Sequence, residues 1–207
     1  MGAIGIRGIA SIGFGSDVSI ENSGSLATEG MNAIGIVATS ASFLGDVDVL
    51  NRGNLTTEGG EAFGIFASLI VNDNDLTVEN SGRIRTRGEL AHGIVATTLG
   101  INHDVEIVNR GDILTFGREA DGISVDVASA TNVTIRNSGR IFTRGDESFG
   151  IDATAFGAQS PLTIINSGEI EAQDDEAIGI AVAALGPGSH RQFGLGYRGL
   201  RRHSCVG

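Results

Sequence analysis

The sequence contains no Lys and no Trp, only 2 Pro and a single Cys. That thiol, Cys205, lies near the C-terminus, so the rest of the chain has neither a disulfide framework nor a thiolate metal site. No apolar run is long enough to span a bilayer, and the N-terminus lacks the basic and apolar regions of a signal peptide. The sequence therefore shows no transmembrane segment, no secretion signal and no disulfide scaffold.

Positive charge is scarce and unevenly placed. Residues 1–186 carry 10 Arg and all 25 acidic residues, a net charge of −15, whereas residues 187–207 carry 4 Arg and no acid. An acidic surface repels a phosphate backbone, so nucleic acid is not an expected partner. The hydrophobic content of 41% is high enough for a folded chain.

An internal repeat of about 29 residues dominates the sequence. The tripeptide Asn-(Ser/Arg)-Gly recurs once in each unit, and a Gly-Ile dipeptide follows each of these Asn residues at a constant distance. The distance from Gly-Ile to the next Asn changes slightly from unit to unit, so length variation is confined to one loop per unit. The repeated Asn residues are Asn22, Asn51, Asn80, Asn109, Asn137 and Asn166.

Within each unit, apolar residues alternate in three short stretches, which predicts three strands and no helix. In one unit, Val47 and Val49 precede Asn51, Leu55 follows it, and Ile65 opens the third stretch. Stacked units would form three parallel sheets around a narrow core. We therefore expect an all-β, right-handed parallel β-helix over residues 1–186, with about six coils of about 29 residues.

Equivalent residues in stacked coils would form columns about 4.8 Å apart. The Asn column is predicted to turn inward at a bend, where each side-chain amide bonds to the amides of the neighbouring coils. The Gly two residues after each Asn is predicted to adopt a positive φ. A column of small residues indicates a tight inward corner. An outward column that alternates in sign would help to fix the register. The small column is Ala33, Ala62, Ala91, Ala120, Ser148 and Ala177, and the charged one ends in Arg83, Asp112, Arg140 and Glu169.

Motifs for cofactors and metals are weak. Gly13-Phe14-Gly15 lacks the third glycine of a dinucleotide fingerprint and precedes no expected helix. The segment Asn72-Asp73-Asn74-Asp75 resembles a calcium loop in composition only, without the spacing, central Gly or final Glu of an EF-hand. We interpret it as a polar loop tip. No cofactor and no metal site are expected.

One acidic cluster is a candidate for glycan cleavage, because some parallel β-helices are polysaccharide lyases or hydrolases. Asp121 and Asp126 lie on one coil and Asp152 on the next, and Asp126 and Asp152 would share an outward face diagonally. His92 occupies the column of Asp121 one coil earlier. Two flanking carboxyl groups can cleave a glycosidic bond. The face has no aromatic platform and no Arg cluster for an acidic sugar, and chance placement among 25 acids is the simpler explanation.

The unit that runs from Asn80-Ser81-Gly82-Arg83-Ile84 to Ala91-His92-Gly93-Ile94 resembles the repeats of autotransporter passenger domains. The resemblance covers about residues 5–186 and implies a right-handed β-helix that a C-terminal β-barrel carries through the bacterial outer membrane. It also implies a location on the cell surface or outside the cell, and a role as an adhesin or stalk. This sequence has no barrel or signal peptide, and no catalytic residues of the family transfer to it.

Three hypotheses follow. A structural stalk predicts no turnover, an adhesin predicts binding of a host surface glycan or protein, and an enzyme predicts products that depend on the acidic cluster. Binding is expected on the variable loops, because loops carry function on a rigid scaffold. These loops are residues 39–46, 68–75, 97–104, 126–132 and 154–161. The segment 187–207 is expected to be a cap or a disordered or foreign tail, and the chain to be a fragment of a longer solenoid.

Overall fold

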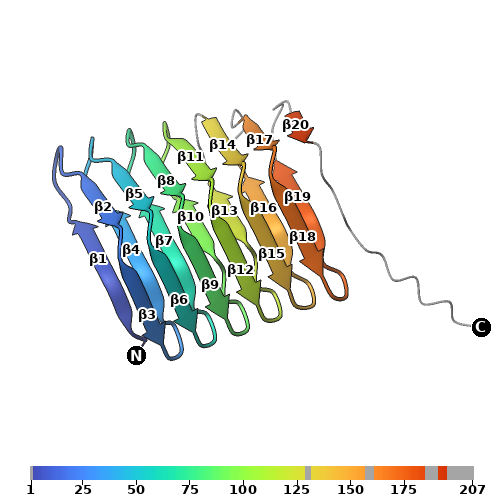
Figure 1. Ribbon diagram of the computed structural model, residues 1–207. Coiled ribbons are helices and arrows are strands. Elements are labelled where there is room, and N and C mark those ends of the chain that lie inside the picture. Colours follow the sequence, from blue (N-terminus) through green and yellow to red (C-terminus); the bar gives the residue numbers. More distant parts are fainter. Residues whose placement is uncertain (1, 129–131, 157–160, 185–190, 195–207) are drawn as a thin grey trace, which may run out of the picture.

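The structure, a computed structural model, describes residues 2–128, 132–156, 161–184 and 191–194. It is an all-β parallel solenoid of about six coils, with the short repeat of the sequence forming one turn, as predicted (Figure 1). Each coil contributes one strand to each of three parallel sheets, which we call sheets 1, 2 and 3. No helix of the described residues is long and apolar enough to cross a membrane.

Sheet 1 consists of β1 (Ile4–Ala10), β4 (Ile34–Ser40), β7 (Phe63–Leu69), β10 (Ile94–Thr98), β13 (Ile123–Val127), β16 (Phe149–Ala155) and β19 (Ile178–Ala184). Sheet 2 consists of β2 (Val18–Asn22), β5 (Val47–Asn51), β8 (Leu76–Asn80), β11 (Asp104–Asn109), β14 (Asn132–Asn137), β17 (Leu162–Asn166) and β20 (Arg191–Gly194). Sheet 3 consists of β3 (Ser25–Glu29), β6 (Asn54–Glu58), β9 (Arg83–Arg87), β12 (Asp112–Phe116), β15 (Arg140–Arg144) and β18 (Glu169–Gln173).

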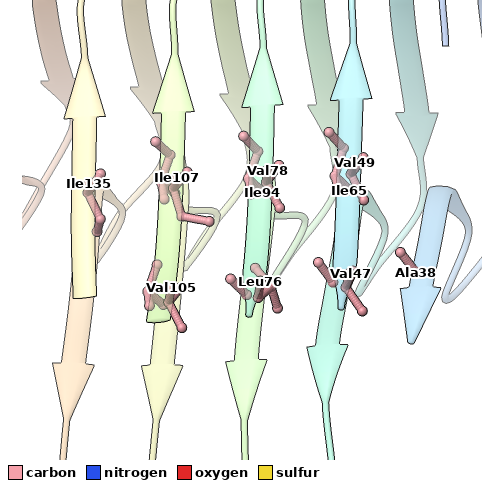
Figure 2. Packing of buried hydrophobic residues seen from close by; sticks show 14 of the residues in the cluster. Ala38, Val47, Val49, Ile65, Leu76, Val78, Ile94, Val105, Ile107 and Ile135 are labelled. Carbon is pink, nitrogen blue, oxygen red and sulfur yellow. The ribbon is translucent and has the colours of Figure 1, made fainter. Parts of the chain in front are cut away.

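The core is a set of aliphatic columns that run the length of the solenoid. Val49, Val78, Ile107 and Ile135 pair in register along sheet 2, and all are at most 1% exposed. Figure 2 shows how they pack beside Ile65 and Ile94 of sheet 1. Strands suit these residues because a branched side chain packs well on a pleated surface and against its copy in the next coil. The resulting register is the one predicted from the sequence.

The corner between sheets 2 and 3 is held by the Asn side chains, which lie inside the solenoid as a continuous ladder. Each Nδ2 donates to the Oδ1 of the Asn in the next coil at 2.8 Å, from Asn22 through to Asn166. Each Nδ2 also donates to the carbonyl oxygen of the Gly two residues later, for example Gly82 O at 3.3 Å. The ladder thus ties adjacent coils together and satisfies the buried carbonyl groups of the bend.

The prediction of a positive φ for the Gly of this tripeptide is wrong. The left-handed glycines in the repeat lie instead at the end of the sheet 3 strands, at Gly30, Gly59, Gly88, Gly117 and Gly145. The Gly of the tripeptide is required by close stacking of the coils. A Cβ on Gly82 would lie 2.0 Å from the carbonyl oxygen of Gly53 in the preceding coil. No side chain larger than hydrogen fits there without a shift of the backbone.

The other predicted columns occupy the corners and faces expected. Ala33, Ala62, Ala91, Ala120 and Ser148 are fully buried in the turns that precede the sheet 1 strands, whereas Ala177 in the last coil is only partly buried. On the outer face of sheet 3, Arg140 pairs with Glu169 in the next coil at 3.5 Å, and Arg87 pairs with Glu58 at 3.7 Å. These exposed ion pairs are worth at most about 1 kcal/mol each, and they favour one register.

Part of the expected tail, residues 187–190 and 195–207, lies outside the described residues, whereas Arg191–Gly194 form β20 and pair with β17. The variable loops begin later than predicted. The sheet 1 strands continue to Ser40, Leu69 and Thr98, because the residues at those ends still bond to the neighbouring coil.

Candidate functional site

The acidic cluster predicted from the sequence lies on sheet 1. Asp126 in β13 is in register with Thr154, and Asp152 in β16 is in register with Ser124, so the two Asp residues sit diagonally across neighbouring strands. Asp126 is exposed and Asp152 is half-buried. The strands alternate in burial along this stretch, which directs both carboxyl groups away from the core.

Asp121 lies in the turn before β13 and is only 6% exposed. Its Oδ1 accepts a hydrogen bond from the backbone N–H of Phe149 at 2.8 Å, and its Oδ2 lies 3.3 Å from His92 Nδ1. The same His92 nitrogen accepts the backbone N–H of Asp121 at 3.0 Å. Asp121 thus bonds to both neighbouring coils, through its carboxyl group to Phe149 and through its backbone N–H to His92, which leaves its carboxyl group poorly placed to act on a bound substrate.

The pKa of Asp152 is raised above its ordinary value. Burial is the main cause, followed by the negative charge of Asp121, while His92 lowers the pKa and Asp126 raises it further. A raised pKa favours the protonated form that a general acid needs. Asp152 and Asp126 are the more exposed carboxyl groups of this face, whereas Asp121 is buried and bonded to the neighbouring coils.

The segment Asn72-Asp73-Asn74-Asp75 lies in the loop between β7 and β8. Asp73 and Asp75 do not belong to the buried core, as expected for a polar loop tip, but Asn74 is only 1% exposed. Its Nδ2 donates to Ser42 O at 2.7 Å, and its Oδ1 accepts Gly45 N–H at 2.9 Å. Asn74 therefore fastens this loop to the loop of the preceding coil, a role like that of the Asn ladder.

The loops that follow the sheet 1 strands stack along one side of the solenoid, at the top of Figure 1. We call the side formed by residues 11–17, 41–46, 70–75 and 99–103 the loop edge. Cross-coil bonds hold these loops in order; for example, Gly15 N–H donates to Phe43 O at 2.8 Å and Asp73 N–H donates to Ile101 O at 3.1 Å. The loop edge is therefore a fixed surface built by the same register as the sheets.

Large apolar side chains protrude from the loop edge. Leu44 is 63% exposed and Leu99 is 69% exposed, and the rings of Phe14 and Phe43 stack with centroids 5.6 Å apart. Such side chains are rarely grouped on the surface of a soluble domain without a role. We call this group the apolar ridge: Ile12, Phe14, Phe43, Leu44, Ile70, Leu99 and Ile101.

A row of four carboxylates borders the apolar ridge where the loops enter sheet 2. Asp17, Asp46, Asp75 and Asp104 occupy equivalent positions in four successive coils, and we call them the Asp row. The Oδ1 of each of the first three accepts the backbone N–H of the next Asp, for example Asp46 Oδ1 from Asp75 at 2.9 Å. The pKa of nearby Asp48 is raised, first by partial desolvation of its carboxyl group and then by the negative charges of Asp46 and Asp17.

Sequence reasoning missed both features. The Asp row is visible in the sequence as an acid at one position of four successive repeats, and three of its members, Asp46, Asp75 and Asp104, lie inside segments interpreted only as variable loops. The apolar ridge had no such signal, because its members do not all occupy one column and their exposure depends on the path of each loop. Alternation identifies the buried face of a strand but says nothing about side chains in a loop.

No protein-family model, curated protein or solved structure matches this chain. The resemblance to autotransporter passengers therefore stays a prediction from the sequence.

Proposed function

We propose that this chain is a structural rod of a bacterial cell-surface or secreted protein of the autotransporter-passenger type, and that its loop edge is the adhesive face. The observation that supports this role is the uninterrupted register of all three sheets, which extends the same three-strand unit over seven strands in sheets 1 and 2. At about 4.8 Å per coil, sheet 1 spans about 29 Å. A rod of this kind holds binding loops at a fixed distance from an anchor.

The folding of such a rod suits export. Each coil bonds mainly to its neighbours, so folding can proceed coil by coil as a chain emerges outside the cell. A host surface glycan or protein is the proposed partner class, and a C-terminal β-barrel the proposed translocator.

Surface display tests the proposal. The chain would be placed between a secretion signal and an autotransporter barrel in a Gram-negative host, and its exposure measured by antibody labelling and protease treatment of intact cells. The proposal expects a labelled, folded passenger outside the cell. Retention of the folded chain in the periplasm, with the barrel correctly inserted, would contradict it. A Gly82→Ala variant, which disturbs coil stacking, serves as the folding-impaired comparison.

The second candidate is a glycan-cleaving enzyme, which the raised pKa of Asp152 beside Asp126 favours. A panel of neutral and acidic polysaccharides incubated with the purified chain would be assayed for new reducing ends. An enzyme predicts products that disappear in both Asp126→Asn and Asp152→Asn while circular dichroism stays unchanged. Equal product release by wild type and both variants would reject this site.

A further inference from the structure

The carboxylates of the Asp row at the loop edge differ from many other acidic side chains in forming no ion pair with the described residues. In the described residues, ion pairs link acids to Arg residues on sheets 2 and 3, such as Glu79 to Arg110 at 2.7 Å and Glu106 to Arg136 at 3.3 Å. None of the ion pairs found among these residues includes a member of the Asp row. Like charges that face each other in neighbouring coils repel, so repulsion among the four carboxylates offsets part of the stabilisation that the first three gain by accepting a backbone N–H from the next coil.

Leu44 adds a second cost at the same place. Its backbone has a φ of 56°, in the left-handed region that a Leu side chain disfavours by about 1–2 kcal/mol. The equivalent residues in the next two coils are Asp73 and Asn102, with φ of 62° and 60°, and short polar side chains tolerate this conformation better. The exposed side chain of Leu44 therefore strains the loop without contributing to the core.

We infer that the loop edge binds a cationic amphipathic helix of a second polypeptide, with its apolar stripe on the apolar ridge and its Lys or Arg residues on the Asp row. This inference rests on the proposed role of the loop edge as the adhesive face, and it names the chemistry of the partner. The Lys or Arg side chains of such a helix would supply the positive charge that no ion pair of the described residues gives to the Asp row. The apolar ridge supplies the contact area, as in other helix-binding surfaces.

The spacing of the coils suits a helix laid along the edge. A helix presents one residue of a stripe for each turn, about every 5.4 Å, and successive coils present one Asp about every 4.8 Å. Over four coils the mismatch accumulates to only about 2 Å, which long Lys or Arg side chains can absorb. A second copy of this chain fits less well, because it would bring another Asp row against the first. An anionic membrane surface is repelled for the same reason.

The probe for the test is a fluorescently labelled 18-residue helix of Leu and Lys, with the Leu residues on one stripe. Binding would be followed by anisotropy, with two comparison peptides: a scrambled peptide of the same composition and a peptide in which Glu replaces Lys. We expect saturable binding of the Leu/Lys helix alone, weakened at least fivefold when salt rises from about 50 to about 300 mM, because exposed charge attraction is screened.

Matched variants locate the site. Leu44→Asn removes an apolar side chain from the loop edge and replaces it with a residue suited to the backbone there. Leu90→Asn is the control, because Leu90 has the same left-handed conformation, with φ of 55°, in a turn at the opposite end of the sheet 1 strands. Asp46→Asn with Asp75→Asn removes two charges but keeps an oxygen that can accept each backbone N–H.

We expect Leu44→Asn and the Asp46→Asn/Asp75→Asn pair each to weaken binding of the Leu/Lys helix at least fivefold, with Leu90→Asn unchanged. Equal binding by Leu44→Asn and Leu90→Asn, or equal binding of the Glu peptide, would overturn the inference. So would a concentration-dependent dimer in light scattering that Leu44→Asn abolishes, since a second copy would then be the occupant. A chain that is displayed on cells but fails to bind this helix would retain its role as a rod and lose only this partner.

Discussion

Replacement of Asn80 by Ala tests how much the Asn ladder contributes to stability. The Asn80 amide is fully buried and makes three hydrogen bonds: it accepts from Asn51 Nδ2 at 2.8 Å, donates to Asn109 Oδ1 at 2.8 Å and donates to Gly82 O at 3.3 Å. At about 1 kcal/mol each, these bonds contribute about 3 kcal/mol to the free energy of unfolding. Loss of Asn80 also leaves Asn109 Oδ1 without its donor inside the corner, which raises the expected cost to about 3–5 kcal/mol.

The end of the ladder provides the matched control. Asn166 accepts from Asn137 Nδ2 at 2.8 Å and donates to Gly168 O at 3.3 Å, and it is 6% exposed. Asn166→Ala therefore breaks one bond between Asn side chains rather than two, and Asn137 Nδ2 keeps its bond to Gly139 O. The expected cost is about 1–2 kcal/mol.

Urea denaturation followed by circular dichroism would measure both variants, with the slope of the transition compared to the wild-type slope to check that the same cooperative unit unfolds. Asn80→Asp extends the series, because it keeps the shape but places a carboxylate against Asn109 Oδ1 and Gly82 O. At neutral pH it should cost at least as much as Asn80→Ala. The reasoning is refuted if Asn80→Ala costs under about 1 kcal/mol, or no more than Asn166→Ala.

Three further changes have expected outcomes that follow from single contacts. Gly82→Ala should destabilise the chain by about 3 kcal/mol or more, because its Cβ would lie 2.0 Å from Gly53 O. Gly24→Ala should change stability little, because the nearest atom to its Cβ would be 3.9 Å away. Equal free energies of unfolding for the two variants in urea denaturation would disprove this. Leu44→Asn should raise the thermal midpoint, since a φ of 56° suits Asn better than Leu, and a fall in the midpoint would show that the side chain supports the fold. Because the pKa of Asp152 is raised in the folded chain, its ionisation opposes folding, and the stability present below the ordinary Asp pKa is lost as pH rises through the folded-state pKa. Asp152→Asn should therefore be more stable than wild type at neutral pH, and the difference should shrink on acidification. A stability difference that does not change with pH would contradict this cause.

The sequence predicted the fold because the information is repeated in every coil. A single apolar triplet such as Val47, Val49 and Leu55 would be ambiguous, but its recurrence at one spacing leaves only a stacked coil as a way to bury every copy. The Asn corner could be predicted for the same reason, since a polar residue in a buried column must bond to its own copies.

The features that the sequence did not predict correctly depend on distances between coils rather than on the conformational preferences of single residues. The Gly of the Asn-x-Gly tripeptide was assigned a positive φ from turn chemistry, yet contact with the coil below decides that position. The face near Asp126 and Asp152 was located correctly by register, but the engagement of Asp121 with Phe149 and His92 could not be read from spacing. Loop side chains follow no period, so the apolar ridge required the structure.

In-register stacking of the coils is the claim on which the rod and its loop edge both depend, and a cysteine cross-link tests it most directly. Thr56 and Arg85 are register partners on sheet 3, so their Cα atoms should lie about 4.8 Å apart, within the range of a disulfide. The test variant carries Thr56→Cys and Arg85→Cys, with Cys205→Ser to remove the native thiol. The pair Thr56→Cys and Arg83→Cys is displaced along the strand by about 7 Å, which puts its Cα atoms about 8 Å apart and beyond that range. Mild oxidation followed by mass spectrometry should show a quantitative disulfide in the first pair and almost none in the second. Equal cross-linking in both pairs, or preference for the displaced pair, would contradict the register.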